Sequence, residues 1–230
     1  MVGGEAVTKL VTIATPNIQE QANGFLINQA MYAVEWGYVF ERVQSVAWSQ
    51  LHPSFSKVFE IDRALAEGFE FVIWADADVA FMDFNADLTK ILKPEHFLTG
   101  YQQNNWKTWK YICNGLLVIR NCEGARNYVT EWADHCVNGC PLTQPGIRTM
   151  IRDHPWEQWS FDALIRHTNY HGIYAATAQE IGCFCPEIWH DGIIWQAGMP
   201  TIHMAGPASW EKRADVFEKI YRKKVIRKKV

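Results

Sequence analysis

Two aspartates one residue apart, Asp76 and Asp78, follow the apolar run "FVIWA" (71–75) and precede a second apolar run, "VAF" (79–81). Alternate side chains of an extended chain point the same way, so both carboxylates are expected on one side of the backbone. Two carboxylates on the same side of the backbone repel each other, and each raises the pKa of the other unless a cation lies near them. A hard divalent cation, Mn²⁺ or Mg²⁺, would bind carboxylate oxygens on one side and phosphate oxygens on the other.

The pair therefore predicts a metal site and an anionic substrate, and two surface aspartates in a turn are the alternative. A carboxylate at the edge of a sheet is expected to add little to the core. On that basis we expect replacement of Asp78 with alanine to remove metal-dependent binding and to leave the fold intact.

The elements before the pair alternate between strand and helix patterns. Residues 6–15, 38–46 and 69–75 read as strands, and the stretches between them, 17–37 and 54–68, have apolar residues at helical spacing. This β-α-β-α-β series predicts an α/β fold with a mostly parallel central sheet flanked by helices. Ligands collect at the carboxyl ends of such strands, where the aspartates lie. Asn17 is the expected N-cap of the first helix.

The rest of the chain continues the same alternation, which predicts one domain over residues 1–210, followed by a basic helix or tail over 211–230. Two long loops, 101–112 and 140–156, are expected over the site because they are rich in Trp, Asn, Pro and Gly. The other expected elements are a short helix at 88–92, strands at 96–102 and 113–121, helices at 123–139 and 156–168, and short strands near 173–176, 193–196 and 201–204.

Several segments resemble, in order, motifs of metal-dependent nucleotide-sugar glycosyltransferases with the A-type fold. The aspartate pair after a hydrophobic strand is one of them. The motifs most similar to these segments are those of the fungal galactosyl- and mannosyltransferase and plant xyloglucan xylosyltransferase family. The chain also resembles a soluble viral glycosyltransferase of similar size. The segments are "FSKVFEIDRAL" (55–65), "CNGLLVIRN" (113–121), "WEQWSFDALIRH" (156–167) and "HMAGP" (203–207).

The resemblance implies a hexosyl- or pentosyltransferase that moves a sugar from a nucleotide-diphosphate sugar, with UDP as the expected nucleotide, to a glycan or other hydroxyl acceptor. It implies metal ligation by His203 together with Asp78 and Asp76. The implied donor-binding residues are Thr15, Asn17, Lys57, Arg63, Asp76, Asn114, Gly115 and Lys212.

The helix motif departs from the family pattern, because Glu157 and Gln158 are separated from Ala163 by four residues. Either Asp162 or the Glu157–Gln158 pair could hold its role. An inverting reaction needs a carboxylate base, for which Asp162 is the first candidate, with Glu157 and Asp191 next. A retaining reaction needs none, and the sequence leaves this choice open.

Two other functions remain as alternatives. A haloacid-dehalogenase-type phosphatase also has D-x-D after a strand, but it needs a downstream acidic pair, and no G-D or D-D dipeptide follows the site. A non-catalytic carbohydrate-binding protein would use its tryptophans, of which five lie in or near expected loops and could stack on a sugar. These are Trp106, Trp109, Trp156, Trp159 and Trp189.

The six cysteines lack C-x-x-C spacing and are expected to be reduced thiols, with a zinc site as a weaker alternative. Its ligands would be Cys136, Cys140, Cys183 and Cys185. No apolar run approaches the ~20 residues of a membrane span, so a soluble, cytoplasmic protein is expected, in the host cytoplasm if it is viral. Nine of the 22 Lys and Arg residues lie in 212–230. This segment is expected to be a solvated helix face with a frayed end, with peripheral contact with an anionic membrane as the alternative, and no nucleic-acid partner is expected.

Overall fold

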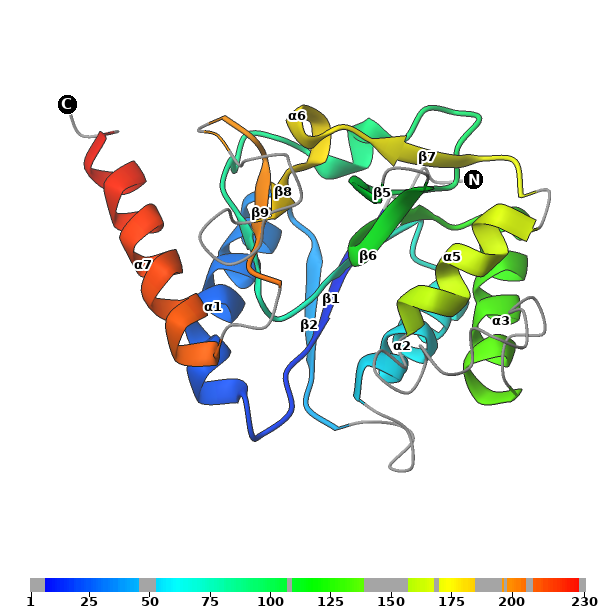
Figure 1. The fold of residues 1–230 in the computed structure, drawn as a ribbon, viewed down its shortest axis with the longest axis horizontal. Coiled ribbons are helices and arrows are strands. Elements are labelled where there is room, and N and C mark those ends of the chain that lie inside the picture. The colour runs from blue at the N-terminus through cyan, green and yellow to red at the C-terminus, as the bar shows by residue number, and fades with distance from the viewer. Residues whose placement is uncertain are drawn as a thin grey trace.

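A central six-stranded sheet organises the molecule (Figure 1). The computed structural model describes residues 7–45, 53–106, 109–138, 157–167, 170–184, 196, 198–205 and 209–227. The strand order is β2-β1-β3-β6-β5-β7. Only β6 runs against its neighbours, because it pairs antiparallel with β3 and β5 whereas the other pairs are parallel. The predicted mostly parallel sheet is thus confirmed.

The helices and strands follow the predicted order. The strands are β1 (Thr8–Ile13), β2 (Val39–Val43), β3 (Phe71–Ala75), β4 (Val79–Phe81), β5 (Leu98–Trp106), β6 (Trp109–Arg120), β7 (Ile173–Ala176), β8 (Cys183–Phe184) and β9 (Thr201–His203). The helices are α1 (Gln19–Glu35), α2 (Ser56–Ala66), α3 (Glu123–Asn138), α5 (Glu157–His167), α6 (Ala178–Ile181) and α7 (Trp210–Arg227), with 3₁₀ turns η1 (Pro53–Phe55) and η2 (Leu88–Ile91).

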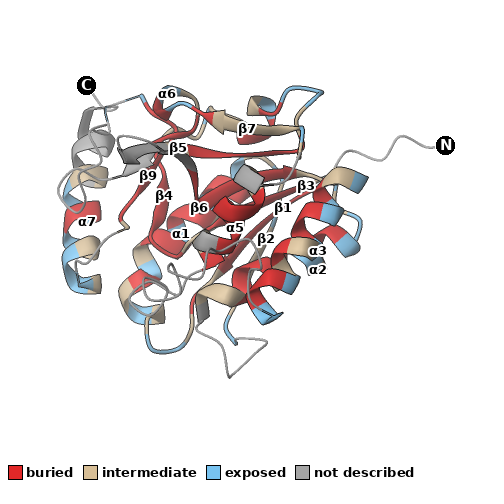
Figure 2. Ribbon diagram, turned by 45° about the vertical axis from the view of Figure 1, so that its right-hand side comes forward, coloured by how far each residue is buried: buried red, intermediate tan, exposed pale blue. Residues whose placement is uncertain are grey.

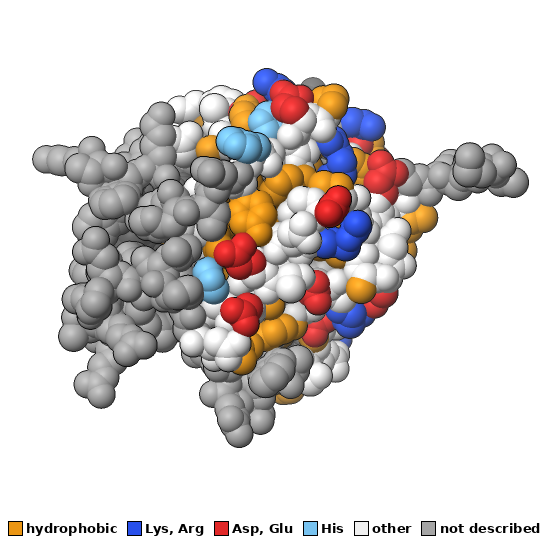
Figure 3. All heavy atoms as spheres, turned by 90° about the vertical axis from the view of Figure 1, so that its right-hand side faces the viewer, with side chains coloured by type: hydrophobic (Ala, Val, Ile, Leu, Met, Phe, Trp, Pro, Cys, Tyr) orange, Lys and Arg blue, Asp and Glu red, His pale blue; other side chains and the backbone are white. Residues whose placement is uncertain are grey.

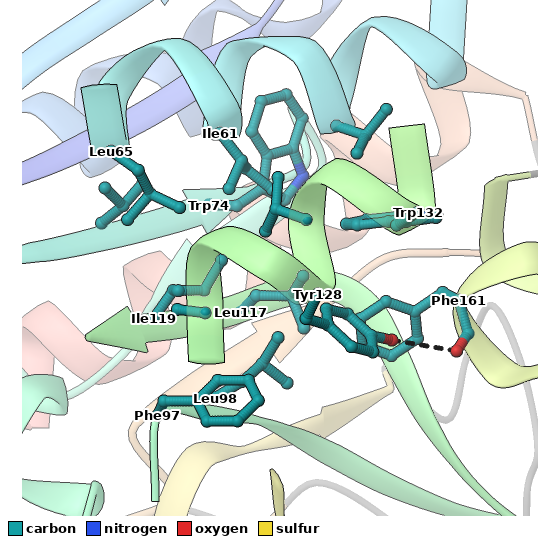
Figure 4. Packing of buried hydrophobic residues seen from close by; sticks show 14 of the residues in the cluster. Ile61, Leu65, Trp74, Phe97, Leu98, Leu117, Ile119, Tyr128, Trp132 and Phe161 are labelled. Carbon is teal, nitrogen blue, oxygen red and sulfur yellow. Dashed lines mark hydrogen bonds between the residues drawn. The ribbon is translucent and has the colours of Figure 1, made fainter. Parts of the chain in front are cut away.

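Helices cover both faces of the sheet because its strands are apolar on both sides, as buried parallel strands require (Figure 2). On one face Leu10 and Ile73 pack with Tyr32 of α1. On the other, Trp74 packs with residues from α2, α3 and α5 (Figure 4). There the hydroxyl of Tyr128 donates a hydrogen bond to the carbonyl of Phe161 at 2.9 Å. Both faces of β3 are thereby covered by packed side chains.

A small second sheet, in the order β4-β9-β8, lies beside the end of β3. Its strand β4 begins directly after the turn formed by the aspartate pair, and Val79 of β4 lies opposite His203 of β9. The amide of Met204 also donates to the carbonyl of Asp78 at 2.9 Å. A segment about 125 residues away in the sequence is therefore registered against the aspartates by backbone pairing.

The C-terminal helix α7 packs on α1 at the left of Figure 1. The rings of Phe25 and Phe217 stack with centroids 4.5 Å apart, and Val216 and Met204 are buried in the same cluster. None of the helices in the described ranges is both long and apolar enough to cross a membrane. The opposite side of the molecule (Figure 3) mixes acidic, basic, histidine and apolar side chains over its described surface.

Two local predictions were wrong. Residues 101–106 and 109–112 belong to the paired strands β5 and β6, whose backbone register joins Trp106 to Trp109, and so they are not loop. The tryptophans and asparagines there were read as loop residues, but strand pairing overrides that composition. Asn17 is also not the N-cap of α1, which follows Ile18, and its side chain instead accepts a hydrogen bond from the hydroxyl of Thr15.

Candidate functional site

Three potential metal ligands meet at the end of β3. The ligand atoms that Asp76, Asp78 and His203 offer all lie within 4.8 Å of one another. Nε2 of His203 is 3.1 Å from Oδ1 of Asp78 and 3.9 Å from Oδ2 of Asp76. Two carboxylates and one imidazole suit a divalent cation such as Mn²⁺, which accepts both oxygen and nitrogen ligands. The residues therefore fit the ion that the sequence predicts.

The position of the His203 ring depends on Gly115 of β6. A Cβ atom at Gly115 would lie 2.1 Å from Cε1 of the imidazole, so only glycine leaves room for the ring. The carbonyl of Gly115 also accepts a hydrogen bond from the amide of Asp76 at 2.7 Å. The sequence resemblance placed Gly115 beside a donor sugar, whereas in the structure it packs against a candidate metal ligand.

Asp78 and His203 influence each other's protonation. Burial alone would lower the pKa of His203, but the carboxylate of Asp78 outweighs burial and raises that pKa to about 10. Burial alone would raise the pKa of Asp78, and His203 and Arg213 together bring it below its ordinary value. In the absence of a metal the two side chains therefore form an ion pair at neutral pH. Cys113 lies behind the ring, with its Sγ 3.7 Å from Nδ1.

Lys57 is buried beside the aspartate pair although it lies on a helix. Its Nζ is 3.0 Å from Oδ1 of Asp76 and 3.0 Å from Oε1 of Glu157, and it donates to the side-chain and backbone oxygens of Asn114 at 3.0 Å each. The side chain of Lys57 is only 2% exposed. Burial favours the neutral amine, yet the carboxylates of Asp76 and Glu157 outweigh burial and raise the pKa of Lys57, so it stays charged.

Helix α5 attaches to this lysine through its first turn. The amide of Asn114 donates to Oε1 of Gln158 at 2.8 Å, and Nε2 of Gln158 donates to the carbonyl of Ile112 at 2.7 Å. Trp132 of α3 donates its indole hydrogen to the carbonyl of Glu157 at 2.9 Å. Among the described residues, Oε2 of Glu157 and Nδ2 of Asn114 are buried without a hydrogen-bond partner. An acceptor and a donor thus remain available beside Lys57.

A pocket of about 210 Å³ opens over the two aspartates. Its wall contains Lys57 and Arg213, so two cations flank the carboxylates, and Thr15 lies at the end of β1 in the same wall. Trp74 contributes an indole that donates to Oδ1 of Asp76 at 2.7 Å. The other lining residues are Ile13, Ile18, Ser54, Asp76, Ala77, Asp78 and Trp210. The arrangement suits an anionic ligand held with a divalent cation.

Some predicted residues lie elsewhere. Arg63 is bound by the carboxylates of Glu41, Glu60 and Glu67, and the structure does not bring it to Asp76. The reason is helical geometry, because six residues after Lys57 α2 has advanced about 9 Å and turned about 240°. Lys212 is exposed on α7. Neither Arg63 nor Lys212 is among the described residues that line the pocket over the aspartates.

Asp162 lies one helical turn after Gln158 and is buried. It is near enough to Tyr128 to help raise the pKa of that phenol, although burial is the larger cause. It is not among the described residues that line the pocket over the aspartates. Glu157 is not among those described lining residues either, but it contacts Lys57, which in turn contacts Asp76.

Other predictions fall on residues that the structure does not describe. These are Asp191, Trp156, Trp189, Cys140 and Cys185, the side chains of Trp106, Trp109, Trp159 and Cys183, the loop at 140–156 and most of the strand expected at 193–196.

Arg213 is the main residue that sequence reasoning missed. Its guanidinium lies 2.6 Å from Oδ2 of Asp78 and is stacked 5.0 Å above the ring of Trp210. The sequence signal was present, because the resemblance leads one to look for a basic residue after the "HMAGP" motif. The resemblance implies Lys212 for that role, and in the structure it is the neighbouring Arg213 that contacts Asp78, because of the orientation of α7.

The chain matches no protein-family model and no curated protein. Solved structures resemble it more clearly. One is a glycosyltransferase involved in the glycosylation of the major capsid of PBCV-1, with a TM-score of 0.64 and 16% identity over 93% of this chain and 99% of the other. An active-site mutant of the galactosyltransferase LgtC gives 0.54 and 11% identity over 94% and 95%. GlyE of Streptococcus pneumoniae TIGR4 gives 0.50 and 12% over 93% and 64%.

At these identities the likeness concerns the fold, and it extends over nearly the whole of the first two structures. The strand order, the reversed β6 and the aspartate turn after β3 are the features that place the candidate site. The chain therefore has the A-type fold of these glycosyltransferases.

Proposed function

We propose that this protein transfers a sugar from a nucleotide-diphosphate sugar to a hydroxyl acceptor, with a divalent cation held by Asp76, Asp78 and His203. The observation that carries the proposal is the group of these three ligands beside a pocket whose wall contains Asp76, Asp78, Lys57 and Arg213. Carboxylates and cations at the carboxyl end of a parallel sheet suit a metal and a diphosphate together. A bound divalent cation would act as a Lewis acid on the departing diphosphate.

The residues of the chain have separate roles in this proposal. Lys57 and Arg213 add positive charge where negative charge grows on the leaving group. Thr15, which follows β1 and lines the pocket, would meet the nucleoside, with Asn17 bonded to it. UDP is the expected nucleotide, from the sequence resemblance. Hydroxyl groups of the donor sugar would find the unpaired Oε2 of Glu157 and Nδ2 of Asn114.

We place Glu157 before Asp162 as the carboxylate that acts at the sugar, because Glu157 contacts Lys57. Glu157 is linked to Asp76 through Lys57, because the ammonium group of this lysine contacts both carboxylates. Gln158 fixes the backbone of Asn114 and so holds that wall in place. An inverting reaction would use a carboxylate as base, and a retaining one would use Glu157 and Gln158 to position the sugar. NMR of the product's anomeric carbon separates these two outcomes.

A thermal-shift panel of UDP- and GDP-sugars, with and without Mn²⁺, tests the proposal. A ligand that binds only the native state raises its melting temperature. We expect at least one nucleotide sugar to do so only when Mn²⁺ is present. If no nucleotide sugar shifts the melting temperature with either Mn²⁺ or Mg²⁺, the proposal is wrong and a non-catalytic carbohydrate-binding function becomes preferable. None of the solved structures named above supports the phosphatase alternative.

A further inference from the structure

Each aspartate of the site already faces a cation of the chain itself. Oδ1 of Asp76 is 3.0 Å from Nζ of Lys57, and Oδ2 of Asp78 is 2.6 Å from the guanidinium of Arg213. The remaining oxygen of Asp78 faces His203 at 3.1 Å. A metal ion that used these carboxylates would therefore share them with two positive charges a few ångströms away.

Arg213 is held in this position by the fold. Its side chain is 15% exposed and lies over the ring of Trp210, three residues earlier on α7. About one turn after Arg213 the helix is fixed by Phe217, which stacks on Phe25 and lies 3.4 Å from the place of a Cβ at Gly24. The guanidinium therefore cannot leave Asp78 without a rotamer change or a movement of α7.

Charge decides what such a site binds well. A guanidinium hydrogen-bonded to a carboxylate competes for the charge that would otherwise attract a metal ion, and it repels the ion directly. A diphosphate in the same pocket reverses this effect, because phosphate oxygens are good partners for both the ion and the arginine fork. Arg213 lines that pocket together with both aspartates.

From this geometry we infer that Arg213 couples the binding of the divalent cation to the binding of the nucleoside diphosphate. It weakens the site for the cation alone and strengthens it for the cation and diphosphate together. The inference rests on the proposed function for the identity of the diphosphate. By linkage, UDP must raise the affinity for Mn²⁺ by the same factor as Mn²⁺ raises the affinity for UDP.

The test measures the dissociation constant of Mn²⁺ by calorimetry, with and without saturating UDP, for the wild type and two variants. For the wild type we expect UDP to tighten Mn²⁺ binding by at least about fivefold, within the range of about 5- to 150-fold that is usual for coupled sites. Arg213→Gln should bind Mn²⁺ alone more tightly than the wild type and should lose most of the UDP effect. Tighter binding of Mn²⁺ alone together with a smaller effect of UDP is the result expected if Arg213 couples the two ligands.

Lys219→Gln is the matched control, because it removes one positive charge from the same helix at an exposed ion pair with Asp215. It should leave both constants unchanged. Weaker binding of Mn²⁺ alone by Arg213→Gln, or an unchanged UDP effect, overturns the inference while the proposed function stands. Absence of any UDP binding by the wild type overturns the proposed function instead. If Arg213→Gln does not fold, the wild-type coupling decides, and a factor near one rejects the inference.

Discussion

Asp78 is a carboxylate of the site that contacts two basic side chains. It is 5% exposed and bonded to both His203 and Arg213, so it is a buried ionic centre. The sequence predicts a surface carboxylate at the sheet edge that adds little to the core, whereas the structure buries Asp78. The covering strand β9 and helix α7 come from the last part of the chain, so nothing local to the D-x-D motif predicts the burial.

Replacing Asp78 with alanine should therefore weaken the fold as well as metal binding. Two positive groups lose a buried partner, which typically costs about 3–5 kcal/mol. Urea unfolding should show this loss, and Mn²⁺-dependent binding of UDP should disappear. Asp83→Ala, which removes a turn carboxylate that accepts from the amide of Asn85, is the control. It should cost less than about 1.5 kcal/mol. An Asp78→Ala protein as stable as the wild type would contradict this account of the site.

The pair of His203 and Asp78 also makes a prediction about pH. In the presence of EDTA, the imidazolium contributes stability that is complete below its ordinary pKa of about 6.5 and is lost as the pH rises through about 10. The free energy of unfolding of the wild type should therefore fall relative to His203→Gln between these limits. The relative fall should exceed about 1.4 kcal/mol, the equivalent of one pKa unit. Parallel urea curves at pH 6.5, 8 and 9.5 measure it, and a constant difference would exclude the ion pair.

Helices α2 and α5 are joined to the sheet by a network rather than by apolar contacts alone. Lys57 of α2 bonds with Glu157 of α5 and Asn114 of β6 inside a buried space. The sequence resemblance implies donor contacts for Lys57 and Asn114 and a candidate catalytic role for Glu157, each taken separately. It could not show that they satisfy one another, because they lie up to 100 residues apart in the sequence and meet only when the elements pack.

A double-mutant cycle tests this network. Lys57→Met and Glu157→Gln should each destabilise the protein, because each leaves a buried charge without its partner. The double variant should recover part of that loss, with an interaction free energy of about 0.5–3 kcal/mol. Urea unfolding of the four proteins gives the value. Additive losses would show that the two side chains act independently, and Lys57→Met with wild-type stability would place the lysine at the surface.

At the scale of the whole molecule, the sequence predicts the central sheet better than it predicts the hairpin of β5 and β6 or the role of α7. The alternation of strands and helices up to Ala75 predicted the sheet, because buried parallel strands and amphipathic helices have strong local patterns. The hairpin of β5 and β6 was partly missed, because its polar and aromatic residues resemble a loop and its pairing is not local. The role of α7 was missed for a related reason. The sequence of α7 is rich in basic residues and has the pattern of a solvent-exposed helix. In the structure, however, Arg213 in its first turn contacts Asp78.

The most direct measurement is release of nucleoside diphosphate from the nucleotide sugar that the thermal-shift panel selects, followed by chromatography with Mn²⁺ or with EDTA. The wild type should release it, slowly to water and faster with a suitable hydroxyl acceptor, and only when Mn²⁺ is present. Asp78→Ala should release none, and Asp83→Ala should match the wild type. Release that is equal in EDTA, or equal in Asp78→Ala under conditions where that variant is folded, would contradict metal-dependent sugar transfer at this site.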